Sequence, residues 1–276
     1  MSYQYGNNSV ILQHIKEQYS SSKNLEARIS IYQYSIDPQT FSEWLTEQIV
    51  PGNNLKILEL GCGTGSLWKD LAASFHNCEI VLSDLSEGML AKTKENLGEG
   101  VFTYEIIDFH NIPYADKTFD IVISNHNLYF ASDLNKVLRE IARVIKDSGV
   151  FYSTTNSADH MASLWKLVDL PDDLKSPNSV LASIFGAETG IENLLNHFQY
   201  VERRFSQGEL RIKNFSPILN YLMSVSNERI RQIAEQSANK IQEKFEAEIR
   251  RCGYFEVGTK GCLFICRKQG TLYGQL

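Results

Sequence analysis

Short apolar runs alternate with amphipathic stretches along the first half of the chain. The run LKILEL at 55–60 is continuous and ends at glycines, which is typical of a buried strand. In the segment from residue 133 to residue 145, apolar residues recur every three or four positions, which predicts a helix. In chain order the pattern predicts a helix at Gln39–Val50, a strand at Leu55–Leu60, a helix at Ser66–Phe75, a strand at Glu79–Ser83, a helix at Glu87–Leu97, strands at Val101–Ile107 and Phe119–Ser124, a helix at Asp133–Ile145, a turn at Lys146–Gly149 and a strand at Val150–Thr154.

Repeated strand–helix units indicate a parallel sheet with helices on both faces. After Asn156 the alternation stops: 157–198 and 215–252 are mostly helical, with strands at Tyr200–Ile212 and Phe255–Cys266. We therefore predict an α/β, doubly wound, mostly parallel seven-stranded sheet with a helical cap. The expected parts are an N-terminal cap segment (1–38), a cofactor-binding core (39–156), a mostly helical substrate region with one strand (157–252) and a final strand completing the core sheet (253–276).

Composition and charge narrow the class of partner. The 276 residues are 43% hydrophobic and 22% charged, as in ordinary globular proteins, and the net charge is −6. The densest basic clusters are the pairs Arg203–Arg204 and Arg250–Arg251, each close to a glutamate, so we expect no nucleic-acid partner. No stretch approaches the ~20 apolar residues of a membrane span, and the N-terminus lacks a secretory pattern, so we expect a cytoplasmic protein without a membrane partner.

The five cysteines form no CxxC pair, and no histidine stands at ligand spacing from them. We expect reduced, structural thiols and no metal site.

The chemistry is expected at the carboxyl ends of the strands, where doubly wound sheets bind ligands. The first strand runs into Gly61-Cys62-Gly63-Thr64-Gly65, three glycines at alternate positions that let the backbone turn and approach a ligand. The helix predicted beyond them would offer unpaired N–H groups to an anion. A dinucleotide-binding loop has the spacing G-x-G-x-x-G, which would place its third glycine at position 66, where this chain has Ser66. Asp84, about 20 residues further on, ends the next strand, where a carboxylate accepts hydrogen bonds from ribose hydroxyls.

Later strand ends agree with a nucleotide-like ligand. Asp108 and Phe109 place a carboxylate beside an aromatic ring, suited to an adenine, although an acidic residue at a strand end is also a common turn cap. Asn125 and His126 follow the fourth strand.

These segments, ILELGCGTG, SDLSEGML, DFHNIPYADKTFDIVIS and LREIARVIKDSGVFY, resemble the ubiquinone/menaquinone-biosynthesis type of class I S-adenosylmethionine (SAM)-dependent methyltransferases, the type 11 group. The resemblance covers roughly 55–156, and the glycine motif is its most specific part. The turn KDSG departs from the usual KPGG. The resemblance implies SAM as cofactor and a small-molecule methyl acceptor.

The resemblance also implies roles for individual residues. Asp84 would hold the ribose, and Glu59 would orient either the loop or the cofactor's amino group. The cofactor-binding set implied is Glu59, Gly61, Cys62, Gly63, Gly65, Asp84, Leu85, Met89, Asp108, Phe109 and Asn125.

The N-terminal stretch NLEARISIYQYS at 24–35 is similar to the lead-in of some family members, which folds over the cofactor. Arg28 would then meet the cofactor carboxylate, and Tyr32 or Tyr34 would shield the sulfonium. The alternative is an amphipathic helix with a solvated arginine.

A sulfonium methyl is already activated, so alignment of the acceptor is the main task, and a general base is needed only if the acceptor loses a proton. The candidates are His126, His160 and Tyr129, with His126 favoured by its position directly after the fourth strand. A structural histidine is the alternative at either position.

The acceptor is not encoded in a motif. The sequence after the fourth strand, 125–128, is NHNL rather than an Asn-Pro-Pro-Tyr type, which argues against amino-group methylation of bases or glutamine. The cap is rich in Phe, Leu and Tyr, which favours an apolar or aromatic small molecule. Alternatives are a SAM- or S-adenosylhomocysteine (SAH)-binding protein without turnover, an RNA methyltransferase and a nicotinamide-dependent oxidoreductase.

Overall fold

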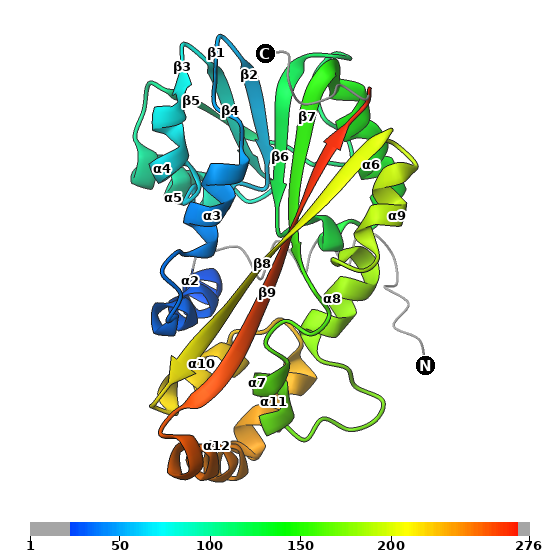
Figure 1. Cartoon of the computed structure of the whole chain (residues 1–276). Coiled ribbons are helices and arrows are strands. Elements are labelled where there is room, and N and C mark those ends of the chain that lie inside the picture. The colour runs from blue at the N-terminus through cyan, green and yellow to red at the C-terminus, as the bar shows by residue number, and fades with distance from the viewer. Residues whose placement is uncertain (1–22, 270–276) are drawn as a thin grey trace.

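A seven-stranded sheet organises the computed structural model, which describes residues 23–269 (Figure 1). Its strand order is β5-β4-β2-β6-β7-β9-β8. The parts of the predicted N-terminal and C-terminal segments at 1–22 and 270–276 lie outside the described residues, as does the start of the chain used to judge a secretory signal.

Five strands of this sheet are parallel neighbours. Leu58 of the central strand is in register with Val81 on one side and Val122 on the other. Side chains alternate between the two faces, and both faces are buried, which explains the continuous apolar runs in the sequence. The five strands are β2 (Lys56–Leu60), β4 (Glu79–Asp84), β5 (Phe102–Ile106), β6 (Phe119–Asn125) and β7 (Ile145–Asn156).

Helices cover both faces. On one face the apolar stripe of α6 packs on the strands through Val137, Leu138 and Ile141, and the Asp133 carboxylate caps the helix at the backbone N–H of Lys136. The other face carries α3 (Phe41–Gln48), α4 (Trp68–Leu71) and α5 (Glu87–Leu97); α6 spans Leu134–Val144. The predicted doubly wound, mostly parallel sheet is confirmed.

The last two strands are antiparallel and long. Strand β9 (Phe255–Arg267) lies between β7 and β8 (Tyr200–Ile212), but β7 pairs only with the segment Gly261–Arg267. The rest of the β8–β9 ladder continues away from the core, where Figure 1 shows it entering the cap. One ladder therefore joins core and cap.

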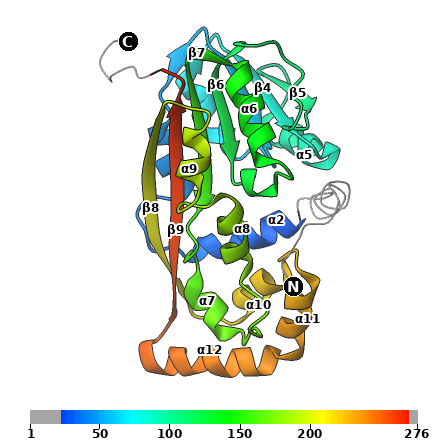
Figure 2. The same cartoon turned by 90° about the vertical axis from the view of Figure 1, so that its right-hand side faces the viewer.

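The cap has its own apolar cluster, built from segments far apart in the sequence. Ile31, near the N-terminus, packs with Leu210, Ile212 and Val257 of the extended ladder. Around them lie α2 (Lys23–Ser30), the 3₁₀ turn Ile31–Tyr34, α7 (Ala162–Leu167), α10 (Ser216–Met223), α11 (Glu228–Gln236) and α12 (Ala238–Cys252), while α8 (Pro177–Phe185) and α9 (Gly190–Leu195) link cap and core (Figure 2).

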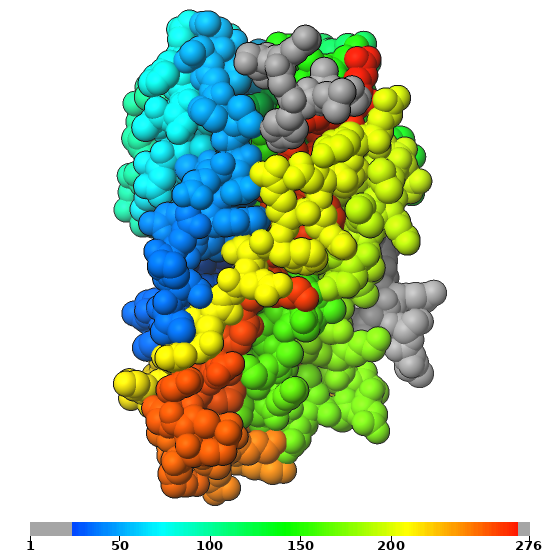
Figure 3. Space-filling view, in the orientation of Figure 1, coloured from blue at the N-terminus to red at the C-terminus, as the bar shows by residue number. Residues whose placement is uncertain are grey.

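The N-terminal segment is bound to the edge strand as well. The backbone N–H of Ile36 donates to the carbonyl of Glu209 (3.1 Å), and Ser35 forms a bridge with Leu210. In Figure 3 the blue N-terminal segment consequently lies directly against yellow β8 on this face.

Two predicted elements were wrong in detail. The helix predicted at Ser66–Phe75 is only the four-residue α4 followed by the 3₁₀ turn Ala72–Ser74, because Phe75 and His76 instead form a two-residue strand, β3, that pairs with β1 (Gly52–Asn53). So short a helix offers little dipole to an anion.

The turn predicted at Lys146–Gly149 is instead an irregularity inside β7: Phe119 pairs with Ile145, and the next pair is Ile121 with Val150. The side chain of Lys146 folds back to the carboxylate of Asp120, at 2.8 Å, which fills the register shift.

Replacing Leu138 by Ala should lower the free energy of unfolding by about 2–5 kcal/mol, because the fully buried side chain would leave a cavity between α6 and the sheet. Urea unfolding measures this change. The neighbouring exposed Arg139→Ala should alter stability by no more than about 0.5 kcal/mol. Equal effects of the two substitutions would contradict the packing described here.

Candidate active site

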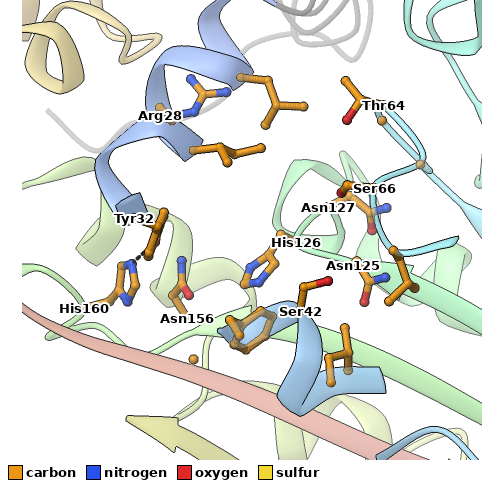
Figure 4. A pocket seen from close by; sticks show the side chains of 18 of the residues that line it. Arg28, Tyr32, Ser42, Thr64, Ser66, Asn125, His126, Asn127, Asn156 and His160 are labelled. Carbon is orange, nitrogen blue, oxygen red and sulfur yellow. Dashed lines mark hydrogen bonds between the residues drawn. The ribbon is translucent and has the colours of Figure 1, made fainter. Parts of the chain in front are cut away.

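A cavity of about 950 Å³ lies at the carboxyl ends of the parallel strands, beneath the cap. Its volume is at the upper end of the roughly 300–1,000 Å³ common for ligand pockets. One end is formed by the loops after β2, β4 and β5, and the other by the cap, the end of β7 and the middle of β8 and β9. Figure 4 shows side chains from both ends. The cavity therefore has room for two ligands side by side.

The glycine loop turns as its spacing predicts. Gly61, Gly63 and Gly65 have φ values of 69°, 60° and 73°, in the left-handed region that side chains disfavour. At Gly61 an added Cβ would also lie 2.2 Å from the Asn127 side-chain nitrogen, which donates to the Leu60 carbonyl. Gly61 and Gly63 line the cavity, whereas Gly65 packs beneath the loop against α5.

Glu59 is a buried carboxylate at the base of the loop, with 2% of its surface exposed. It accepts hydrogen bonds from the Trp68 indole N–H (2.7 Å) and from the Asn125 amide (3.0 Å). Burial raises the pKa of Glu59 to about 7, and its two hydrogen bonds oppose that rise. This arrangement orients Asn125 at the end of β6.

Asp84 ties the loop to the end of β4. Its carboxylate accepts from the backbone N–H of Gly63 (3.0 Å) and of Ser86 (2.9 Å). Burial raises the pKa of Asp84 while those N–H groups lower it. Two backbone donors leave lone pairs on a carboxylate, so it remains able to accept further hydrogen bonds.

Leu85 and Met89 follow Asp84 around the same end of the cavity, and Cys62 lies in the loop opposite. Burial raises the pKa of the Cys62 thiol, which keeps it neutral beside the two carboxyl groups. All five described cysteines are free, and the described residues contain no cluster suited to a metal ion.

Asp108 and Phe109 line the cavity after β5, as predicted. Asp108 is also a turn cap, since one carboxylate oxygen accepts from the backbone N–H of His110 (2.9 Å) and lies 2.7 Å from its ring Nδ1. The geometry is thus compatible with both interpretations of Asp108, as an adenine-binding residue and as a turn cap. His110 itself was not singled out from the sequence.

His126 lies between the two ends of the cavity (Figure 4). Its backbone is left-handed, with φ 51°, and its N–H donates to the Thr154 carbonyl at 3.1 Å. The ring packs against Phe41 and makes no side-chain hydrogen bond among the described residues. Burial lowers the pKa of His126 to about 4, so the ring is neutral at pH 7. Tyr129 lines the same region.

His160 is buried at the cap end, 3.0 Å from the Tyr32 hydroxyl. Its Nδ1 accepts the backbone N–H of Lys260 (2.9 Å), and burial lowers its pKa to about 3. A neutral ring whose Nδ1 accepts must carry its proton on Nε2. The ring thus has no free lone pair, which does not favour His160 as a proton acceptor.

Arg28 lines the cavity from α2 and donates from Nη1 to the Ser224 carbonyl at 2.8 Å. It is therefore partly anchored to the cap rather than fully solvated. Tyr32 also lines the cavity, whereas Tyr34 packs against the cap cluster.

Sequence reasoning did not single out Asn156, Asn178 or Tyr221, which line the cap end of the cavity. Asn156 is the last residue of β7, so the expectation that ligands bind at the carboxyl ends of parallel strands could have identified it. Asn178 and Tyr221 belong to helices of the cap, and no motif marks them.

Residues 58–153 match the family model described as "Methyltransferase domain" (Methyltransf_11). The chain is 30% identical over 151 residues to malonyl-[acyl-carrier protein] O-methyltransferase of Legionella pneumophila, covering 54% of this chain and 52% of that one. It is 34% identical over 105 residues to demethylmenaquinone methyltransferase of Thermotoga maritima, covering 38% and 45%. The chain spans about half the length of the curated relatives it matches.

Solved structures share the fold at lower identity. The [4+2]-cyclase SpnF has a TM-score of 0.60 and 16% identity, covering 93% of this chain and 96% of that one. Phosphoethanolamine N-methyltransferase 2 of Haemonchus contortus, solved with SAM, has a TM-score of 0.59 and 18% identity, covering 94% and 60%.

The family match identifies residues 58–153 as a class I SAM-dependent methyltransferase domain, a class whose cofactor is SAM. Within that class these residues match the type 11 group.

The buried Glu59 carboxyl should make stability depend on pH. Its pKa is raised on folding from 4.5 to about 7, so the folded state binds the proton more tightly than the unfolded state. The free energy of unfolding should fall as pH rises from about 4.5 to 7 and then level off, with a contribution on the order of 3 kcal/mol.

Denaturant unfolding of the ligand-free protein across pH 4.5–8 measures this contribution. Glu59→Gln cannot ionise, so the difference between the wild-type and variant curves isolates it. A difference that is constant with pH would contradict the raised pKa.

Proposed function

We propose that this chain transfers the methyl group of SAM to a small-molecule acceptor by in-line displacement. The observation that carries the proposal is a cavity that joins the glycine loop and Asp84 at one end to the cap at the other. The activity of the whole chain is a proposal because the matched relatives are covered over only about half of their length.

The loop end fits the cofactor's parts. Asp84, with lone pairs remaining, would accept from the ribose hydroxyls, and Asp108 with Phe109 would bind the adenine. Gly61 and Gly63 would line the cofactor with backbone alone. Asn125, oriented by Glu59, would face the methionine end, and Arg28 would meet its carboxylate. SAM supplies an activated methyl group when bound.

The protein's own contribution is alignment and proton removal. An acceptor in the cap end would lie across His126 from the glycine loop (Figure 4). The neutral His126 ring, whose nitrogens make no side-chain hydrogen bond among the described residues, would accept a proton if the acceptor must lose one. His160 would act through Tyr32 rather than as a base.

The acceptor is proposed to be small because the whole cavity has a volume of about 950 Å³ and the cofactor would fill one end of it. Demethylmenaquinone and the malonyl group carried by malonyl-[acyl-carrier protein], which appear in the names of matched relatives, are the first candidates. No described helix is long and apolar enough to cross a membrane. A cytoplasmic location and the lack of a nucleic-acid partner stay predictions from the sequence.

Radiolabelled SAM and an acceptor panel test this function. The panel holds the two named candidates, small phenols and carboxylates, and a transfer RNA. Transfer to a small molecule is expected. Tight SAH binding with no transfer to any member would instead favour a binding protein without turnover, and transfer to RNA alone would contradict the proposed acceptor class.

Asp84→Asn should weaken SAH binding at least tenfold, because an amide replaces two acceptor oxygens with one and places a donor against the Gly63 or Ser86 N–H. Isothermal titration calorimetry measures the affinity. Asp70→Asn, an exposed carboxylate on α4, serves as the matched control and should leave it unchanged. Equal affinities for all three proteins would exclude Asp84 from the cofactor site.

If His126 removes the proton, the acid limb of kcat/KM should lie near pH 4 rather than at the ordinary histidine value of 6.5, because burial disfavours the charged ring. Activity should stay level between pH 8 and about 5.5. A limb near pH 6.5 that is lost in His126→Asn, which also tolerates the left-handed backbone, would contradict this prediction.

A further inference from the structure

Two side chains at the cap end of the cavity form a hydrogen-bonded pair that cofactor binding does not require. Tyr32 comes from the turn after α2, and His160 from the segment after β7. Figure 4 shows them on the opposite side of His126 from Thr64 and Ser66 of the glycine loop. The pair therefore faces the part of the cavity that the proposed function leaves to the acceptor.

The direction of the hydrogen bond between them is fixed by a backbone group. The Lys260 N–H can only donate, so Nδ1 of His160, at 2.9 Å, must accept. The neutral imidazole then carries its proton on Nε2 and donates it to the Tyr32 oxygen at 3.0 Å. The backbone positions of His160 are satisfied too, because its carbonyl accepts from Asn178 at 2.7 Å.

This direction leaves the proton of Tyr32 unused. An oxygen that accepts from His160 must turn its own O–H elsewhere, and the described residues offer that O–H no acceptor. Tyr32 lines the cavity, and 38% of the residue's surface is exposed. A hydroxyl hydrogen that lies at the cavity wall without a protein partner can bind a ligand atom that accepts a hydrogen bond.

The surroundings favour the same kind of ligand atom. Tyr221 lies near Tyr32 and also lines the cavity, as does Asn178, whose side chain donates to the His160 carbonyl. Arg28 lies near Tyr221 as well and is the one cationic side chain among the described residues that line the cavity. The cap end thus presents the hydroxyl groups of Tyr32 and Tyr221, while the charge of Arg28 is the one that the proposed function assigns to the cofactor carboxylate.

Resting on the proposed function, we propose that Tyr32 donates a hydrogen bond to an oxygen of the methyl acceptor, and that His160 is the positioning residue that holds Tyr32 as a donor. The acceptor class is then a molecule that presents a carboxylate, phenolate or carbonyl oxygen at the cap end. A methyl acceptor that presents only N–H groups would face hydrogen-bond donors of the protein and is therefore disfavoured.

Three variants separate these roles. Tyr32→Phe removes only the hydroxyl. His160→Asn keeps an oxygen near Nδ1 for the Lys260 N–H but does not reach Tyr32, whereas His160→Gln places an amide donor near the position of Nε2. Because His160→Asn and His160→Gln are both neutral amides, a difference between them reports the donor to Tyr32.

The probes are benzoate and benzamidine, planar molecules of the same shape, of which one accepts and the other only donates hydrogen bonds. Calorimetry measures their binding to the SAH-saturated protein, and SAH affinity is measured beside them. Long-range ¹H–¹⁵N spectra report the tautomer of His160, whose signals are identified by their loss in His160→Asn.

We expect wild type to bind benzoate at least tenfold more tightly than benzamidine. Tyr32→Phe and His160→Asn should each weaken benzoate about tenfold, while His160→Gln should stay within about threefold of wild type. The affinity for SAH should be unchanged in all three variants, and His160 should show the Nε2–H tautomer from pH 5 to 8.

Several results would overturn the inference: an Nδ1–H tautomer, no preference for benzoate, equal benzoate affinity in wild type and Tyr32→Phe, or a loss of SAH affinity in Tyr32→Phe, which would assign the oxygen to the cofactor. Failure of the proposed function is distinguishable, because it would appear as absent SAH binding or absent methyl transfer in wild type. The probe measurements need no turnover.

Discussion

The site depends on the buried carboxyl group of Glu59. Its two oxygens receive one donor from α4 and one from the end of β6, so a single side chain fixes the helix after the glycine loop and the strand that leads to His126. Because α4 has only four residues and no side-chain cap, the Trp68 hydrogen bond adds to the burial of Trp68 and Leu71 in holding this segment. A buried acceptor with two satisfied donors is specific in direction, and an apolar residue of the same size would leave both donors unpaired.

The two ends of the cavity differ in the hydrogen-bonding groups that they offer to a ligand. At the loop end the side chains that reach the ligand space are mainly acceptors, such as Asp84 and Asp108. At the cap end they include the hydroxyl donors Tyr32 and Tyr221. The fold alone does not define an activity, because a [4+2]-cyclase shares it at 16% identity. The proposed methyl transfer is supported instead by the family match over 58–153 and by the residues of the site.

The sequence predicted the core far better than the cap. Parallel strands that are buried on both faces leave a strong local signal, and the glycines with Asp84 lie within 24 residues of each other, so pattern and spacing were enough. The length of α4 could not be predicted, because the pairing of β3 with β1 overrides the helical pattern. The irregularity at 146–149 lies beside an ion pair between Lys146 and Asp120 of the neighbouring strand, a contact that no local pattern indicates. The orientation of His160 is set by a backbone N–H 100 residues away, for which no local signal exists.

Strand β9 couples the stability of the core to that of the cap. Its C-terminal half pairs with β7 inside the core, and its N-terminal half contributes Phe255 and Val257 to the apolar cluster of the cap. Strand β9 belongs to both hydrophobic clusters. If the cap unfolds, half of the β8–β9 ladder loses its packing, and because the ladder is continuous, the half in the core is destabilised too. Core and cap are therefore coupled into one cooperative unit of unfolding, although their residues come from different parts of the chain.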